Sequence, residues 1–308
     1  MTKSGNVLPL LAVGTTLVFW ASAFVAIRHL ADDFSAGPLT LARMGVAAIA
    51  LAFFALRDGL PRPTRKQWAS ITVIGVLWFS IYHLALNQGE VWVDAGTAAM
   101  LLQVSPVLVA VLAAVFLGER FTTPLVIGLL VAFAGVALIG LSGNGDSDVD
   151  SGKMLLGALL CVVSAVTYSV SLILQKPLLT DLTAVHVTWL ACGIGAITCL
   201  PFGPSLLSEA ADAPTSSLLW LVYLGVFPTA IAFTTYAYAL RHMTASSLGV
   251  TTYLVPPITI VMALIFLGET PPTVAYVGGV LALVGVAIAR RSPARRAAAA
   301  AAKEPAPA

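Results

Sequence analysis

The residues of this sequence that could recognise a small molecule are mostly uncharged polar and aromatic side chains within long apolar runs. Sites for small organic molecules combine apolar and aromatic walls with a few polar groups. Such a site suits a small zwitterion, an aromatic metabolite or an amphipathic drug better than a multiply charged phosphate. The candidate binding residues of this kind are Trp20, Ser22, Trp78, Tyr82, Gln103, Ser105, Tyr168, Trp189, Thr252 and Tyr253.

Two ionisable residues within the apolar runs, Arg43 and His83, join the candidate set. Ionisable groups inside a bilayer are costly and are therefore functional candidates by default. Arg43 could hold an anionic group, pair with Glu90 or Asp94, or extend its guanidinium to the membrane surface. His83 could satisfy a local hydrogen bond or take part in proton transfer. No Asp or Glu stands in the middle of an apolar run, so coupling through a buried acid is not visible.

The chain contains none of the short sequence motifs, named below, that indicate catalysis or nucleotide binding. It has no Walker A, H-E-x-x-H, G-x-S-x-G or G-x-G-x-x-G sequence, which excludes an ATP-driven pump for this chain alone. Asp146, Asp148 and Asp150 resemble the start of a calcium loop, but Gly157 stands where the bidentate Glu should be. We therefore predict no catalytic residue, no metal site and no cofactor.

The composition is that of a membrane protein. The chain has 308 residues, of which 59% are hydrophobic and 10% charged, and its mean hydropathy is +0.95. A soluble domain carries roughly 25% charged residues. The net charge of +2 gives no indication of nucleic-acid binding.

About ten apolar runs have the length of a transmembrane helix, which needs roughly 20 residues. The runs are continuously apolar, whereas barrel strands alternate apolar and polar residues, so the predicted class is an all-α membrane protein. The runs lie near 7–27, 38–56, 68–86, 95–117, 124–142, 154–174, 184–203, 216–238, 245–267 and 272–290.

The basic residues predict the orientation. With a cytoplasmic N-terminus, nearly all of the 16 Lys and Arg residues fall on the cytoplasmic side, and only Arg28 and Lys153 fall on the other. The positive-inside rule therefore predicts an even number of spans with both termini in the cytoplasm. We expect a multi-pass protein of the cytoplasmic (inner) membrane.

The chain contains an internal repeat at an offset of 150 positions. Phe116-Leu117-Gly118-Glu119 aligns with Phe266-Leu267-Gly268-Glu269, and Gly135-Val136-Ala137 aligns with Gly285-Val286-Ala287. Each copy holds five runs, an odd number, so the two copies must have opposite orientations. Inverted repeats of this kind are typical of secondary transporters, in which they expose a central site to each side in turn.

The repeat divides the chain into four predicted parts. Residues 1–142 form the first five-helix repeat, 143–153 an acidic linker outside the cytoplasm, 154–290 the second repeat, and 291–308 a disordered, basic and Ala-rich cytoplasmic tail.

Proline residues occur at matched positions in the fourth and ninth runs. Pro106 aligns with Pro256, which Pro257 follows. Proline lacks the backbone N–H and clashes with the preceding turn, so it kinks or interrupts a helix. Matched interruptions in two repeats are the best sequence pointer to a transporter site. We therefore expect these prolines to shape the site without contacting the ligand.

Two further patterns are interpreted as structural. Gly118-Glu119 and Gly268-Glu269 each end an apolar run, where glycine suits a helix C-terminus. The fifth and tenth runs each carry two glycines seven positions apart, which favour close helix approach. Those glycine faces could contact each other or form a homodimer through the two runs. The four residues are Gly128, Gly135, Gly278 and Gly285.

The sequence resembles the drug/metabolite transporter superfamily, with two EamA-like domains. The resemblance covers residues 7–290 and is carried by the aligned Pro and Leu-Gly-Glu residues, by Arg43, and by Trp20-Ala21-Ser22-Ala23-Phe24, Ala95-Gly96-Thr97-Ala98-Ala99 and Ala245-Ser246-Ser247. It implies ten helices around a central cavity through which metabolites or drugs cross the cytoplasmic membrane. Tyr168 departs from the pattern, because it stands where the second copy would place a Trp like Trp20.

These observations favour a secondary transporter, an exporter of amino acids or related metabolites or of drugs, working by alternating access. Import of a vitamin or nucleobase is the alternative within this class. A membrane-embedded enzyme would need clustered acids or nucleophiles at one membrane face, and none is visible. The expected partners are a small-molecule substrate and the lipid bilayer, with no nucleic acid.

Overall fold

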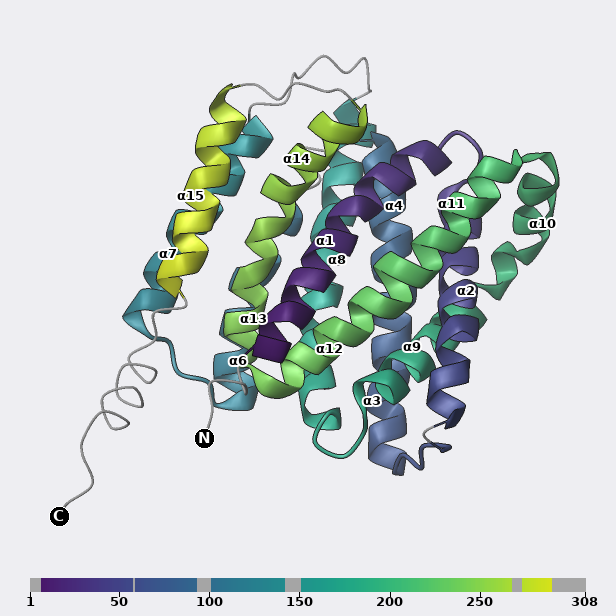
Figure 1. Ribbon diagram of the computed structural model, residues 1–308, viewed down its shortest axis with the longest axis horizontal. Helices are drawn as coiled ribbons and strands as arrows, with labels where there is room; N and C mark the ends of the chain where they lie inside the picture. Colours follow the sequence, from purple (N-terminus) through teal and green to yellow (C-terminus); the bar gives the residue numbers. More distant parts are fainter. Residues whose placement is uncertain (1–6, 58, 93–100, 142–150, 268–272, 290–308) are drawn as a thin grey trace.

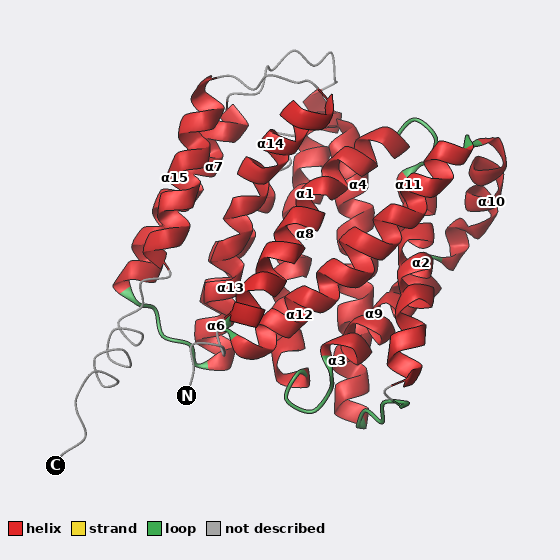
Figure 2. Cartoon of the chain, in the orientation of Figure 1, coloured by secondary structure: helices red, strands yellow, loops and turns green. Residues whose placement is uncertain are grey.

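The computed structural model describes residues 7–57, 59–92, 101–141, 151–267 and 273–289 (Figure 1). Within these ranges the chain forms helices joined by short loops and contains no strand (Figure 2). Each of the ten predicted runs contains at least one of these helices. The all-helical prediction is therefore confirmed for the described residues.

The first repeat supplies five of the runs. Its helices are α1 (Val7–Leu30), α2 (Ala36–Arg57), α3 (Arg65–Val76), the π-helix η2 (Leu77–Tyr82), α4 (His83–Trp92), α6 (Ser105–Leu117) and α7 (Thr123–Leu141). The segments α3, η2 and α4 form one continuous span of 28 residues.

The second repeat contains counterparts of these helices in the same order, together with η3, α10, α13 and η5. Its helices are α8 (Ser151–Leu178), α9 (Ala184–Thr198), the 3-10 helix η3 (Leu200–Phe202), α10 (Gly203–Asp212), α11 (Thr215–Gly225), the π-helix η4 (Val226–Ile231), α12 (Ala232–His242), α13 (Ala245–Thr251), the 3-10 helix η5 (Thr252–Leu254), α14 (Val255–Leu267) and α15 (Thr273–Ala289).

Five of the described spans are long and apolar enough to cross a bilayer unaided: α1, α2, α3–η2–α4, α8 and α11–η4–α12. The run predicted at 184–203 is shorter than expected, because α9 ends at Thr198 and the chain bends by 53° into α10. Pro201 and Pro204 lie in the first turns of η3 and α10, where a proline is tolerated at the start of a new helix but cannot continue the old one.

The helices reproduce the sequence repeat. α6 begins at Ser105 and α14 at Val255, while α7 begins at Thr123 and α15 at Thr273, both at the predicted offset. Gly128 of α7 lies against Ala289 of α15 and Gly135 lies against Ala282, so the corresponding helices α7 and α15 run in opposite directions, as an inverted repeat requires (Figure 1).

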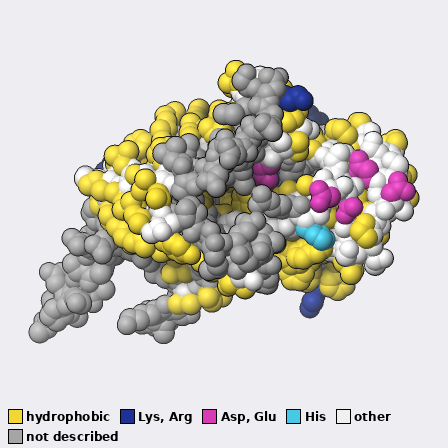
Figure 3. Space-filling model, turned by 90° about the horizontal axis from the view of Figure 1, so that it is seen from above, with side chains coloured by type: hydrophobic (Ala, Val, Ile, Leu, Met, Phe, Trp, Pro, Cys, Tyr) yellow, Lys and Arg dark blue, Asp and Glu magenta, His cyan; other side chains and the backbone are white. Residues whose placement is uncertain are grey.

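The two ends of the bundle differ in charge. The acidic end, where α1 turns into α2 and where α10 lies, carries Asp32, Asp33, Glu209 and Asp212. Figure 3 looks down on this end and shows acidic side chains gathered over one side of it. The basic end, where α2 leads into α3 and α8 into α9, carries Arg57, Arg62, Arg65, Lys66 and Lys176.

Hydrogen bonds join the two repeats at the acidic end. Ser217 donates its hydroxyl to Asp33 at 2.6 Å. Ser35 donates its backbone N–H and hydroxyl to the carboxylate of Glu209, at 3.1 and 2.7 Å. These bonds hold the α1–α2 turn of the first repeat to α10 and α11 of the second.

Glu119 joins the repeats at the basic end. Gly118 ends α6 with a φ of 66°, which confirms the predicted helix end. The carboxylate of Glu119 then accepts hydrogen bonds from the backbone N–H groups of Ala245 and Ser246, at 2.7 and 3.1 Å, and from the Ser246 hydroxyl at 2.6 Å. It thereby caps the N-terminus of α13, where a negative charge is favourable. Glu269 lies outside the described residues.

The glycine faces of α7 and α15 contact each other within the chain. Gly128 lies against Gly285 and Ala289, Gly135 lies against Gly278 and Ala282, and Gly285 lies against Ala132. The backbones approach so closely that a β-carbon at any of these three glycines would meet backbone atoms. Of the two possibilities for the glycine faces, this contact within the chain is the one observed, and a homodimer through the two runs stays a prediction.

Candidate functional site

The two π-helices lie at corresponding positions of the repeats, in the middle of their spans. η2 covers residues 77–82 and η4 covers 226–231. Ser80 donates its hydroxyl to the carbonyl of Gly75, and Thr229 donates to the carbonyl of Leu224 at 2.8 Å, in each case five residues back. A π-turn inserts one residue into a helix and is frequent at functional sites. Here it redirects side chains toward the interface between the repeats.

An aromatic cluster fills that interface. We define it as Trp20 from α1, Trp78 and Phe79 from η2, Tyr168 from α8, and Phe233 and Tyr236 from α12. Ring centroids lie 4.8 Å apart for Trp20 and Tyr236, 5.0 Å for Trp78 and Tyr168, and 4.9 Å for Phe79 and Phe233. Both repeats contribute to the cluster.

The aromatic cluster has two polar features. The hydroxyls of Tyr168 and Tyr236 lie 2.5 Å apart and share a hydrogen bond. The indole N–H of Trp20 is buried and has no hydrogen-bond partner among the described residues. The rings of Trp20 and Tyr168, which lie near corresponding positions of the two repeats, meet edge to face with centroids 6.5 Å apart. The cluster thus lies where the two repeats meet, and its buried apolar rings include one N–H donor without a partner among the described residues.

A group of buried polar residues, the Arg43 nest, adjoins the cluster toward the acidic end. We define it as Thr40 and Arg43 from α2, His83 and Asn87 from α4, and Thr229 from η4, all of which are buried. Arg43 donates Nε–H to the Thr229 hydroxyl at 2.6 Å. Tyr82 connects the nest to the cluster, because its ring lies 4.9 Å from His83 and 6.4 Å from Tyr168.

The proline-marked interruptions of the fourth and ninth runs contact each other. A turn at Gln103 and Val104 precedes α6, whose first turn holds Pro106, and η5 precedes α14 with Pro256 and Pro257. Pro256 has no N–H for the carbonyl of Thr252, four residues back. That carbonyl accepts a hydrogen bond from the backbone N–H of Val255 and a second one from Gln103 Nε2 at 3.2 Å. The first repeat therefore supplies a side-chain donor to a carbonyl that lacks its usual donor four residues on, because that residue is the proline of the second repeat.

The sequence-predicted candidates fall into several groups. Trp20, Trp78 and Tyr168 lie in the aromatic cluster, Arg43 and His83 lie in the nest, and Tyr82 lies between them. Gln103 and Thr252 lie at the helix interruptions, and the carbonyl of Ser105 accepts a hydrogen bond from Ser169 at 3.3 Å.

The remaining candidates do not belong to the aromatic cluster. Ser22 bonds to Tyr223 at 2.8 Å and so joins α1 to α11. Trp189 is half-buried on α9. Tyr253 is buried among residues of α6, α7, α13 and α15, and its hydroxyl has no partner among the described residues. Asp94, the second acid considered as a partner for Arg43, lies outside the described residues.

Sequence reasoning missed Phe79, Asn87, Thr229, Phe233 and Tyr236. The eighth run contributed no candidate, although Phe233 and Tyr236 have helical spacing and follow another proline within an apolar run, Pro228. Within the described residues no group of His, Cys, Asp and Glu could hold a metal ion. Cys161, Cys192 and Cys199 are free and buried.

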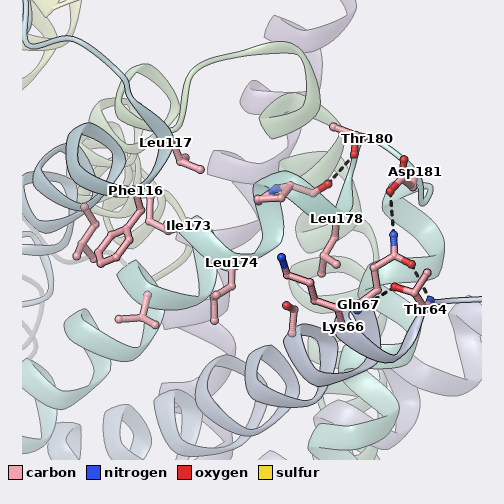
Figure 4. Close-up of a pocket in the computed structure, with 14 residues that line it drawn as sticks. Thr64, Lys66, Gln67, Phe116, Leu117, Ile173, Leu174, Leu178, Thr180 and Asp181 are labelled. Carbon is pink, nitrogen blue, oxygen red and sulfur yellow. Dashed lines mark hydrogen bonds between the residues drawn. The ribbon is translucent and has the colours of Figure 1, made fainter.

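A cavity of about 820 Å³ opens at the basic end between α3, α6 and α8 (Figure 4). One wall is apolar and includes Phe116, Leu117 and Ile173. The other wall is polar, and there Gln67 Nε2 donates to Asp181 at 2.9 Å. This cavity suits an amphipathic molecule, but none of the sequence-predicted candidates lines it.

Replacing Gln103 by Leu is expected to lower the free energy of unfolding by about 1 kcal/mol, because the Thr252 carbonyl loses its side-chain donor. Pro256→Ala restores an N–H four residues after Thr252. In the Pro256→Ala background, replacing Gln103 by Leu should therefore lower the free energy of unfolding by a smaller amount. Thermal unfolding of the two single variants and the double variant in detergent measures this coupling. Strictly additive losses would contradict the role of Gln103 as the substitute donor.

The fold defines a class: multi-pass membrane proteins built from two inverted helical repeats. A sequence model of the EamA-like transporter family matches residues 8–141 and, a second time, residues 155–291. The chain belongs to the EamA-like transporter family.

Individual relatives are similar over nearly their whole length. The "Probable terminal-alkyne amino-acid exporter" of Streptantibioticus cattleyicolor is 39% identical over 280 residues, which cover 91% of this chain and 92% of that protein. The "Uncharacterized transporter YdfC" of Bacillus subtilis is 30% identical over 267 residues, covering 87% and 86% of the two chains. A solved crystal structure shares the fold, with a TM-score of 0.75 at 21% identity over 94% of this chain and 98% of that one.

Proposed function

We propose that this protein is a secondary transporter that exports small amino acids or related organic compounds by alternating access. The observation that carries the proposal is the aromatic cluster at the interface of two inverted repeats, with the buried Arg43 beside it. A small amphipathic molecule finds there an apolar surface and a charged group. The relative from Streptantibioticus cattleyicolor, named as an amino-acid exporter, supports this substrate class and direction.

The ties between the repeats suit alternating access. The bonds of Asp33 and Glu209 close the acidic end, and those of Glu119 close the basic end. Opening one end requires one set of bonds to break while the other set persists. Substrate drives the cycle by binding one state more tightly than another. We propose that the basic end faces the cytoplasm of the cell, because Lys and Arg are enriched in cytoplasmic loops.

Purified protein in sealed liposomes tests the proposal. Amino acids, including terminal-alkyne amino acids, nucleobases, vitamins and cationic drugs are offered together, with and without a proton gradient, and mass spectrometry follows their movement. Movement of amino acids supports the proposal, and preferential outward movement in cells supports export. Movement of a vitamin or nucleobase alone would support the import alternative. Protein that unfolds cooperatively but moves none of these compounds would contradict it.

Replacing Trp20 by Ala is expected to lower the transport rate about tenfold, because it removes one aromatic wall and its free N–H. Trp68→Ala is the matched control, since Trp68 is exposed on α3, away from the cluster. Transport rates and melting curves of both variants separate a loss of function from a loss of folding. Equal transport by the two variants would argue against a site at the aromatic cluster.

A further inference from the structure

Two buried side chains of the Arg43 nest present hydrogen-bond acceptors without partners. His83 Nε2 and Asn87 Oδ1 are buried, and neither has a hydrogen-bond partner among the residues that the structure describes. The two residues are four positions apart on α4 and therefore lie on the same helix face. A buried polar atom without a partner is costly, so this pair points to a missing donor.

The neighbours of His83 determine which ring nitrogen carries the proton. Nδ1 lies 2.9 Å from the backbone carbonyl of Trp78. A carbonyl can only accept a hydrogen bond, so Nδ1 carries the proton of the neutral ring. Nε2 consequently presents its lone pair to the nest and acts as an acceptor.

The neighbours of Asn87 determine the orientation of its amide in the same way. Thr40 donates its hydroxyl hydrogen to the carbonyl of Ala36 at 2.7 Å, so its oxygen is left as an acceptor. Asn87 must therefore direct its amide nitrogen toward Thr40, and Nδ2 lies 3.2 Å from the Thr40 hydroxyl. Oδ1 is then the free end of the amide, and it is a second acceptor beside Nε2 of His83.

Arg43 supplies donors to the same nest. The Thr229 hydroxyl donates to the Leu224 carbonyl, so it can only accept from Arg43 Nε–H. The bond to Thr229 uses Nε–H, and the guanidinium carries two terminal amino groups besides. These groups form the planar fork that binds a carboxylate through two parallel hydrogen bonds. Arg43 follows Thr40 by three positions on α2, and Thr40 bonds to Asn87 of α4, so Arg43 lies on the face of α2 that contacts α4.

We propose that the Arg43 nest binds the zwitterionic head group of an α-amino acid. The substrate carboxylate accepts from the terminal amino groups of Arg43, and the substrate ammonium donates to His83 Nε2 and Asn87 Oδ1. This inference rests on the proposed function and specifies its substrate class.

The charge of the surroundings fits a zwitterion. Half-buried Glu90 lies three positions after Asn87 on α4 and is opposite in charge to Arg43. A zwitterion adds no net charge to a region that holds Arg43 and Glu90, whereas a simple carboxylate or a simple amine adds one. An ion transferred into a membrane interior is strongly disfavoured when it is not paired.

The position of the Arg43 nest beside the aromatic cluster also suits the side chain of an amino-acid substrate. His83 lies 6.3 Å from Phe79 and 5.9 Å from Phe233, both in the aromatic cluster. A head group held in the nest therefore directs its side chain toward the cluster. We expect small apolar side chains to be preferred over charged ones.

Competition among three matched compounds tests the inference. Counterflow of labelled L-propargylglycine in proteoliposomes is measured against unlabelled L-propargylglycine, 4-pentynoic acid, which lacks the amine, and 3-butyn-1-amine, which lacks the carboxylate. The amino acid is expected to compete at concentrations about tenfold or more below those of the other two, because each of them satisfies only half of the nest. Equal competition by the acid or the amine would overturn the zwitterion site and leave the transporter standing. No counterflow of any amino acid would overturn the proposed function itself.

Two variants test whether His83 and Asn87 of the Arg43 nest recognise the substrate ammonium group. His83→Phe and Asn87→Leu each remove one acceptor, so each should reduce the preference for propargylglycine over pentynoic acid about tenfold. His186→Phe is the matched control, because His186 is also buried but bonds to the Ala55 carbonyl at 3.1 Å toward the basic end. It should keep the full preference. A purely structural role of His83 and Asn87 predicts instead that both compounds weaken equally, and that result would overturn the assignment.

Discussion

Replacing Arg43 by Leu is expected to lower transport of the amino-acid substrate by about a hundredfold or more while the protein still folds. The pair at stake is the one proposed between the Arg43 guanidinium and the substrate carboxylate. Removing one partner of a buried, hydrogen-bonded charge pair costs about 3–5 kcal/mol, and every 1.4 kcal/mol is a factor of ten in binding. Arg43 is buried on α2, and its position is fixed by Thr229, which keeps its own bond to Leu224 in the variant. The loss should therefore appear in kcat/KM, measured by counterflow, more than in the melting temperature.

Two further substitutions sharpen this expectation. Arg57→Leu is the control on the same helix, since Arg57 is exposed at the last turn of α2 at the basic end. It should change the transport rate less than twofold. Arg43→Lys retains the charge but not the planar fork, so it should fall between the wild type and Arg43→Leu. Full activity of Arg43→Leu would show that Arg43 serves packing alone.

The fold was predictable to a large extent because the apolar runs have the length of membrane-spanning helices and the repeat is visible in the spacing of Pro, Gly and Glu residues. The matched prolines at 106 and 256 and the Gly-Glu pairs fix the offset, and five runs per copy fix the inversion. The structure confirms both at α6 and α14 and at α7 and α15. The bend at Cys199 was not expected, although Pro201 and Pro204 mark it in hindsight.

The candidate site was less predictable because the sequence does not separate inner from lipid-facing helix faces. In a membrane protein both faces are apolar, so helical periodicity carries little contrast. Tyr253 was therefore grouped with the central residues, whereas it faces α7 and α15, and Tyr236 was overlooked. The two π-turns shift the register of every following residue by a fraction of a turn, and only Ser80 and Thr229 hint at them.

The polar pattern of the nest could not be read from the sequence for another reason. The free acceptors on His83 and Asn87 follow from what Trp78 and Thr40 can donate or accept, and these contacts exist only in the folded chain. Arg43 was found because a charge within an apolar run is rare. Its partner Thr229 lies 186 positions away in the other repeat, and no local signal connects the two.

Replacing Gly285 by Ala is expected to destabilise the protein by about 3 kcal/mol, because one added β-carbon would meet the backbone of Ala132 on α7. Overpacking against backbone cannot be relieved by a rotamer change, so the two helices must separate along their whole contact. The control is Gly14→Ala on α1, where a β-carbon would meet no atom within 4 Å. That substitution should instead stabilise by up to about 1 kcal/mol, since alanine favours the helix. Melting curves in detergent therefore compare the same change, Gly to Ala, at two positions: the melting temperature should fall for Gly285→Ala and rise for Gly14→Ala. Equal melting temperatures would show that α7 and α15 do not pack face to face through their glycines.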